Sequence, residues 1–225
     1  MQSVFGGSHG IYLDDAVSGI EITGNILYDT DGLATMNGGG RDNIVRNNIL
    51  VNTKGGHETD MCGLQFANFD FNGEESDSWN LLGWLNVDLD SFNDYYPLIP
   101  IIDYQHDIWA TYYPEMAAIP NNWNQVSNSH WLEPEGNVFS CNVSWNVETL
   151  FVEATTGGSG ALSHYAEISN NLETDPLFMD EVHLNMNLQP NSPAFSLPCF
   201  LPIPFNSIGI LETGKMTYMP LVLNH

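Results

Sequence analysis

The stretch Asn43-Ile-Val-Arg-Asn-Asn-Ile-Leu-Val-Asn52 decides the fold, because two other parts of the chain have the same pattern. It aligns with residues 20–29 and with residues 137–146. The asparagines that share one position of this alignment are Asn25, Asn48 and Asn142. A repeat of about 23 residues holds two or three short strands with their turns, so it predicts stacked coils and not strand–helix units.

Short runs that begin with glycine and alternate apolar with polar residues form a second repeat, and each is typical of a β-strand. The runs are Gly10-Ile-Tyr-Leu-Asp-Asp15, Gly32-Leu-Ala-Thr-Met-Asn37 and Gly63-Leu-Gln-Phe-Ala-Asn68. Such strands, joined by asparagine and glycine turns, predict an all-β parallel β-helix in which each coil hydrogen-bonds to the next about 4.8 Å away. In that fold the repeated asparagines form a structural column, because stacked side-chain amides bond coil to coil.

A long insertion at residues 69–134 interrupts the repeat and is rich in tryptophan, tyrosine and proline. A segment of this length is usually functional or disordered, and its aromatic content argues against disorder. We expect an ordered excursion from a single domain of residues 1–225. The proline-rich end at residues 173–225 predicts an irregular cap that seals the last coil. Nothing similar precedes Gly10, so we expect a chain truncated at its N-terminus.

Composition excludes several classes of partner. The chain has 4 Lys and Arg against 28 Asp and Glu, a net charge of −24, so nucleic-acid phosphates would find few basic groups. An anionic polymer would be repelled unless bound cations intervened. No apolar run approaches the roughly 20 residues of a membrane-spanning helix. The three cysteines, Cys62, Cys141 and Cys199, indicate neither a disulfide framework nor a zinc site.

Several stretches resemble a known class of protein. They are HGIYLDD at residues 9–15, GGGRDNIVRNNILVN at 38–52, DPLF at 175–178, and NSPAF and PIPFNSIGI within 191–210. Together they resemble the C-terminal half of bacterial right-handed parallel β-helix proteins, the superfamily of pectate lyases and polygalacturonases. The resemblance implies a right-handed coil, a secreted, periplasmic or cell-surface location, and a polysaccharide or oligosaccharide partner. It does not fix the chemistry, because the superfamily carries several activities.

The outward face of the first strands predicts a groove for a sugar chain. Alternation along residues 11–14 sends Tyr12 and Asp14 outward if the two aliphatic residues point inward. The glycine alignment places Ala34 and Met36 beside them, then Gln65 and Ala67, with Asn37 and Asn68 in register with Asp15. Small side chains would make a flat bed, and amides and carboxylates would suit substrate hydroxyls. The alternative is a face covered by the insertion.

Paired carboxylates predict the chemistry of this groove. Glycoside hydrolysis needs one carboxylic acid to protonate the leaving oxygen and one carboxylate as base or nucleophile, about 5.5 Å apart for retention or about 6.5 to 9.5 Å for inversion. The predicted set is Asp14, Asp15 and Asp42, with His9 able to assist proton transfer near neutral pH. Alternatively, the acidic pair only ends a strand and His9 is a bystander.

Arg41 follows three glycines and precedes Asp42, so bulky side chains do not crowd it. It could clamp a substrate carboxylate, but we favour an internal ion pair with one of the predicted catalytic aspartates. In the insertion, Trp109, Tyr112 and Tyr113 could stack on sugar rings, although we favour a small core of their own. Residues 55–60 resemble a metal-ligand patch in composition, and there we favour a solvated loop.

The sequence thus predicts a glycoside hydrolase acting on a neutral or weakly charged polysaccharide, with no required cofactor. Calcium is possible, although no set of metal ligands is predicted. One alternative is a non-catalytic glycan-binding or surface-scaffold solenoid. Another is a calcium-assisted polysaccharide lyase, which needs a base for the proton α to a uronate, and Arg41 and Lys54 are the candidates. The pattern does not predict an oligomeric state.

Overall fold

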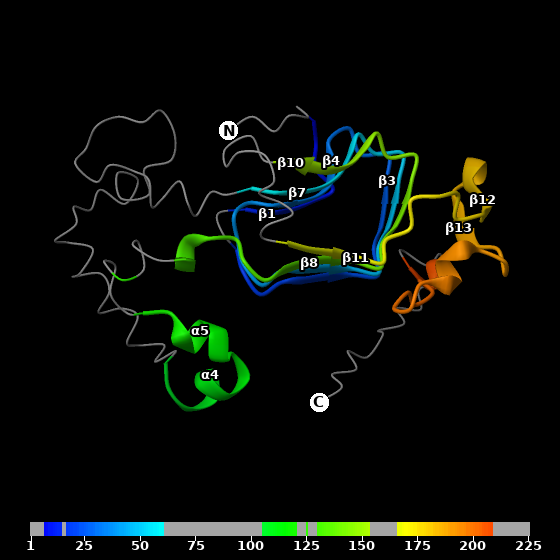
Figure 1. Cartoon of the computed structure of the whole chain (residues 1–225). Coiled ribbons are helices and arrows are strands. Elements are labelled where there is room, and N and C mark those ends of the chain that lie inside the picture. Colours follow the sequence, from blue (N-terminus) through cyan, green and yellow to red (C-terminus); the bar gives the residue numbers. More distant parts are fainter. Residues whose placement is uncertain are drawn as a thin grey trace, which may run out of the picture.

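The computed structural model describes residues 7–14, 17–60, 105–120, 125, 130–153 and 166–208. Its core is three sheets of parallel strands, shown in Figure 1. Sheet A consists of β1 (Ile11–Leu13), β4 (Leu33–Asn37), β7 (Gly55–Thr59) and β10 (Thr149–Glu153). Sheet B consists of β2 (Glu21–Thr23), β5 (Ile44–Arg46), β8 (Asn137–Ser140) and β11 (Ala166–Ser169). Sheet C consists of β3 (Ile26–Tyr28), β6 (Ile49–Val51) and β9 (Val143–Trp145).

The chain visits sheets A, B and C in turn, and each visit adds a strand beside the previous one. The predicted all-β class is therefore confirmed, and the stacked parallel strands are consistent with a parallel β-helix (Figure 1). The interior holds Ile22, Ala34, Val45, Leu50 and Phe139, all buried. Burial of these aliphatic and aromatic side chains holds the three sheets together.

The predicted column of asparagines is confirmed and extends by one member. The Asn48 Oδ1 accepts the Asn25 backbone N–H and side-chain amide, each at 3.0 Å. Asn142 accepts the same pair of bonds from Asn48, and Asn171 accepts them from Asn142. The residue before each asparagine has a left-handed backbone, with φ between 53° and 71°. That turn, made by Gly24, Asn47, Cys141 and Asn170, aims every asparagine at the coil beside it.

The predicted register of sheet A is wrong by two residues. Tyr12 pairs with Met36, whereas the glycine alignment paired it with Ala34. A Cβ on Gly10 would lie 2.6 Å from the Ala34 carbonyl oxygen, so Gly10 lies beside Ala34 and not beside Gly32. Each glycine is required by its own close backbone contact, so the two glycines do not mark equivalent positions.

The third strand of sheet A is also not the predicted one. The position beside β4 belongs to β7, whose five residues are all buried, and not to residues 63–68. The expected solvated loop is thus a buried strand. Its two glycines permit close packing, since a Cβ on Gly56 would lie 2.4 Å from the Leu150 carbonyl oxygen. Gln65, Ala67 and Asn68 lie outside the described residues.

The described part of the predicted cap, residues 173–208, packs against sheet C. A core cluster joins Phe178 and Met186 to Ile49, Val51 and Val143, which lie in strands of sheet C. A disulfide between Cys141 and Cys199 and a hydrogen bond from the Leu201 N–H to Asn47 tie the segment down. Its elements are β12 (Phe178–Asp180), β13 (Asn185–Leu188), and 3-10 turns at Glu181–His183, Pro193–Ser196 and Phe205–Ser207.

The described part of the insertion contains two short helices, α4 (Asp107–Tyr112) and α5 (Pro114–Ala118), which contact each other. A 3-10 turn at His130–Leu132 then leads into β8. Order was expected in this segment, and the described residues have it. Among the described residues, no helix has the length and apolarity needed to cross a membrane.

Candidate functional site

Two carboxylates lie together at the end of β7, and we call Glu58 and Asp60 the β7 acid pair. Glu58 follows His57, whose ring stacks on the core residue Phe139, so alternation sends the Glu58 side chain to the outer face of sheet A. There it lies in one row with Tyr12 and Met36 of the neighbouring strands. The Asp60 backbone N–H donates to a carbonyl oxygen of β4 at 2.8 Å, which fixes the end of the strand.

Both acids are buried, and the charge of Asp60 acts on the pKa of Glu58. Glu58 is 4% exposed and Asp60 is 3% exposed. Burial, and then the charge of Asp60, raise the pKa of Glu58 to about 7. The Glu58 Oε2 has no hydrogen-bond partner among the described residues. One carboxyl of the pair therefore carries a proton near neutral pH, beside a second carboxyl that can take the opposite role.

His57 lies on the inner face of sheet A, next to Glu58 in β7. Its Nδ1 lies 2.8 Å from the Thr35 hydroxyl and its Nε2 lies 3.2 Å from the Thr59 hydroxyl. Burial lowers the pKa of His57 to about 4, so the ring is neutral near pH 7. Both nitrogens are used in the core, and the residue positions β7 without facing the outer row.

Two of the three predicted catalytic aspartates lie within the described residues. Asp14 is exposed at the end of β1 with its Cα beside Gly38, while Asp15 lies outside the described residues. Asp42 lies further along the turn of the next coil, where its carboxylate accepts a bond from the Arg41 Nε at 3.0 Å. Its backbone N–H donates to the Glu135 carbonyl oxygen. Asp14 thus lies at the end of β1 and Asp42 in the turn after β4, and their joint action stays a prediction.

His9 and Tyr12 lie together at the start of the outer row. The Leu33 N–H donates to the His9 Nδ1 at 3.2 Å, which leaves the Nε2 to carry the proton of the neutral ring. The two rings meet edge to face with centroids 5.5 Å apart. Partial burial lowers the pKa of His9. Tyr12 is 44% exposed, so its ring is accessible in the same row as Glu58.

Arg41 makes the internal ion pair that we favoured, with a partner that the sequence did not indicate. Besides Asp42, its guanidinium lies 3.5 Å from the Glu135 carboxylate and over the Trp131 ring at 5.2 Å. His130 in turn lies 2.7 Å from the same Glu135 carboxylate. We call these five residues the Arg41 cluster. Glu135 is 94 residues from Arg41, and the insertion between them hides this proximity from sequence reasoning.

Two predicted contributions to the groove belong instead to the packed interior. Asn37 is buried and bonds to both backbone groups of Gly40, so it holds the glycine turn and is not available to substrate. Ala34 belongs to the core and Met36 is only 6% exposed, so they do not form an open bed. This part of sheet A is therefore buried and is not an open groove.

The three predicted stacking residues of the insertion differ in packing and exposure. Trp109 packs against Tyr113 with ring centroids 5.6 Å apart, as in the small core that we favoured. Tyr112 and Tyr113 are 69% and 57% exposed, so both also present ring surface to solvent. Within the described ranges, no group of three or more His, Cys, Asp or Glu side chains could hold a metal ion.

The pKa of Glu58 predicts how stability depends on pH. The folded state holds this proton up to about pH 7, whereas a carboxyl of ordinary pKa 4.5 loses it earlier. The contribution of Glu58 to stability is therefore full below about pH 4.5 and is lost as pH rises through about 7. We expect Glu58→Gln to gain stability relative to wild type over that range, measured by urea unfolding at pH 4.5, 6 and 7.5. The same change at the exposed Glu167 is the matched control, and a flat difference for Glu58→Gln would contradict the assignment.

Comparisons with known proteins were made by family model, by sequence and by structure. No protein-family model, curated protein or solved structure matches the chain. The function is therefore argued from the geometry of the β7 acid pair and its row.

Proposed function

We propose that the chain is a carbohydrate-active right-handed parallel β-helix protein that hydrolyses a neutral or weakly charged polysaccharide. The β7 acid pair carries this proposal, because a protonated Glu58 beside Asp60 is the combination that glycoside hydrolysis needs. The net charge of −24 disfavours a polyanionic substrate. The pair replaces Asp14, Asp15 and Asp42 as the proposed acid and base.

In this proposal Glu58 donates its proton to the glycosidic oxygen as the bond to that oxygen breaks. Asp60 acts either as the base that takes a proton from the water attacking the anomeric carbon, or as the nucleophile on that carbon, in which case water then hydrolyses the glycosyl intermediate. The exposed Tyr12 ring, two strands away in the same row, offers a stacking surface for a sugar ring. His9 orients this ring through its edge-to-face contact.

The test is the activity of Glu58→Gln on a panel of neutral polysaccharides. Loss of a general acid typically costs 10²- to 10⁴-fold, so we expect a rate of new reducing ends at least about 100-fold lower. Glu167→Gln is the matched control, since Glu167 is exposed in β11 of sheet B, and its rate should stay within about threefold. Unchanged hydrolysis in Glu58→Gln, or an equal loss in Glu167→Gln, would overturn the assignment.

A non-catalytic glycan-binding or surface-scaffold role is the second candidate, and the burial of Ala34 and Met36 favours it. Glycan binding without new reducing ends would identify that role. A lyase has less support, because both candidate bases are engaged in ion pairs. Arg41 pairs with Asp42 and Glu135, and Lys54 pairs with Asp31, which raises the pKa of Lys54. Products that absorb as unsaturated uronates would nevertheless identify a lyase.

We propose a location in the periplasm, at the cell surface or outside the cell. The Cys141–Cys199 disulfide supports it, since such bonds persist in oxidising compartments and are rare in reducing ones. A carbohydrate polymer as partner fits the same location.

A further inference from the structure

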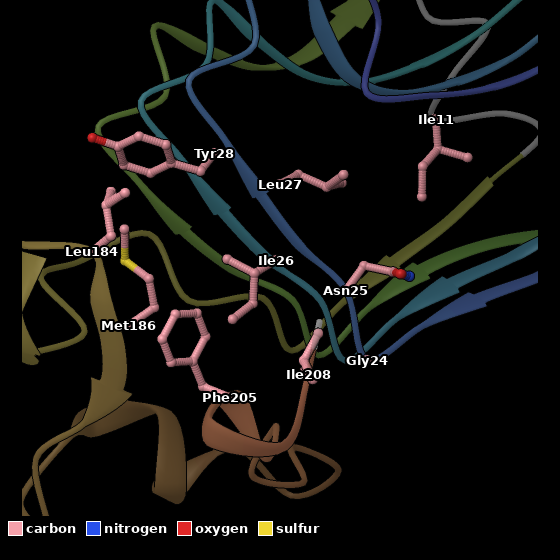
Figure 2. A pocket seen from close by; sticks show the side chains of 10 residues that line it. All are labelled: Ile11, Gly24, Asn25, Ile26, Leu27, Tyr28, Leu184, Met186, Phe205 and Ile208. Atoms are coloured by element: carbon pink, nitrogen blue, oxygen red, sulfur yellow. The ribbon is translucent and has the colours of Figure 1, made fainter. Parts of the chain in front are cut away.

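One row of inward-facing side chains crosses sheet A, and two of its four residues are polar. The row pairs Ile11, Thr35, His57 and Phe151 from β1 to β10. Its two ends are apolar and pack against the core, and Figure 2 shows Ile11 and Leu27 directed toward one another on the inner side of their strands. Thr35 is fully buried and His57 is 3% exposed. Polar groups at this depth need hydrogen-bond partners within the core.

Two threonine hydroxyls contact the two nitrogens of the His57 ring, and we call Thr35, His57 and Thr59 the His57 network. The Thr35 Oγ1 lies 2.8 Å from Nδ1, and the Thr59 Oγ1 lies 3.2 Å from Nε2. The Thr35 hydroxyl also donates to the Gly56 carbonyl oxygen at 3.4 Å. Thr59 is 1% exposed, and within the described residues His57 is the hydrogen-bond partner of its hydroxyl.

Donors and acceptors in the His57 network balance for one tautomer of the ring. A neutral imidazole carries one N–H and one bare nitrogen. With the proton on Nε2, the ring would donate to Thr59, and the hydrogen of that hydroxyl would have no acceptor in the core. With the proton on Nδ1, the ring donates to Thr35, the Thr35 hydroxyl donates to Gly56, and the Thr59 hydroxyl donates to Nε2. Every donor is then used, so the Nδ1–H tautomer has the lower free energy.

The His57 network fixes the backbone that carries the β7 acid pair. His57 precedes Glu58, and Thr59 lies between Glu58 and Asp60. The ring joins β7 to β4 through Thr35, in addition to the backbone hydrogen bonds between the two strands. A movement of Thr59 would change the separation of the two carboxyl groups on either side of it. Glycoside hydrolysis depends on that separation, so the network acts on the chemistry through the backbone.

We propose that His57 is a positioning residue for the β7 acid pair, held as the Nδ1–H tautomer by Thr35 and Thr59. The ring lies on the inner face of sheet A, stacked on Phe139, so it acts without contact to substrate. A fixed strand keeps Glu58 buried beside Asp60, the condition that raises the pKa of Glu58 to about 7. The catalytic consequence rests on the proposed hydrolysis, whereas the tautomer and the pKa of Glu58 are measurable without substrate.

The first measurement is nitrogen-15 NMR of the imidazole rings in the wild-type chain near pH 7. The His57 ring is recognised because it stays neutral down to about pH 4, since burial lowers its pKa. We expect a protonated Nδ1 and a bare Nε2 in this ring. A ring protonated on Nε2 would overturn the proposal, and this result does not depend on the folding of any variant.

Thr59→Val removes the hydroxyl that donates to Nε2 and keeps the shape of the side chain. Loss of this bond loosens the end of β7 and admits water to Glu58. We therefore expect the pKa of Glu58 to fall from about 7 toward 4.5, measured by carbon-13 NMR of the carboxyl. Hydrolysis should lose at least about tenfold in kcat with KM within about threefold, because the acid pair is misplaced while substrate contacts are kept. Thr59→Ser keeps the hydroxyl and should restore both values.

Thr53→Val is the matched control, since Thr53 is 2% exposed and its hydroxyl has no hydrogen-bond partner among the described residues. It should leave kcat and the pKa of Glu58 as in wild type. An unchanged pKa of Glu58 in Thr59→Val, an equal fall in Thr53→Val, or no recovery in Thr59→Ser would overturn the proposal. A wild-type chain without hydrolytic activity would contradict the proposed function alone, and a fall in the pKa of Glu58 in Thr59→Val would still support the positioning role.

Discussion

Replacing Asn48 with alanine is expected to lower the free energy of unfolding by about 4 kcal/mol, because several buried groups lose their partners at once. Asn48 is fully buried. Its Oδ1 accepts two bonds from Asn25, and its amide donates to the Ile22 and Arg46 carbonyl oxygens and to Asn142. Each buried polar group left unpaired costs about 1 to 3 kcal/mol, so the loss exceeds that of an ordinary polar contact.

Asn25→Ala is the matched control for this prediction. Asn25 stands at the open end of the same column, where its amide donates to the Thr23 carbonyl oxygen and to Asn48, and where its Oδ1 receives no bond from another asparagine of the column. We expect this change to cost about 1 kcal/mol, the usual value for a partly exposed hydrogen-bonding group. Urea unfolding followed by circular dichroism measures both variants. Equal losses of unfolding free energy at the two positions would show that the burial of Asn48 does not increase the cost of losing its hydrogen bonds.

The column was predictable because it requires the same side chain at every coil. A side-chain amide accepts from one coil and donates to the next, so the recurrence of Asn25, Asn48 and Asn142 at a fixed spacing indicated the column. The left-handed turn before each member adds a second constraint, which Gly24 and Asn47 satisfy. Spacing and turn chemistry therefore agree, and the three stacked sheets follow from them.

The register of sheet A was not predictable from glycines. A glycine marks a close backbone approach, and Gly10 and Gly56 make different approaches in different coils. The strand β7 was missed because Gly-Gly-His-Glu-Thr has the polar composition of a loop. It is buried because Thr35 and Thr59 satisfy the His57 ring, a match between distant residues that a linear pattern does not display.

The predicted groove was built on the same glycine alignment, so its residues were placed in the wrong register. With β7 beside β4, Glu58 lies in the outer row and Asp60 follows the end of the strand, while the turn residue Asp42 pairs with Arg41. The alternation of His57, Glu58 and Thr59 was the available signal, since a strand would turn one acid outward. The polar composition of residues 55–60 instead favours a solvated loop. The position of Glu135 beside Arg41 depends on where the chain returns after the insertion, which the sequence left open.

Removing the Cys141–Cys199 disulfide is expected to lower the free energy of unfolding by about 4 kcal/mol, since the bond closes a loop of 58 residues. Cys199→Ala, Cys141→Ala and the double variant should lose similar amounts, because each breaks the same bond and the second change finds nothing further to remove. Unfolding of wild type in urea with and without reductant measures the effect, and reductant should leave the Cys199→Ala variant unchanged. Additive losses in the double variant would instead assign the effect to packing of the buried Cys141 side chain. A wild type that keeps its stability in reductant would remove the support that the disulfide gives to an extracytoplasmic location.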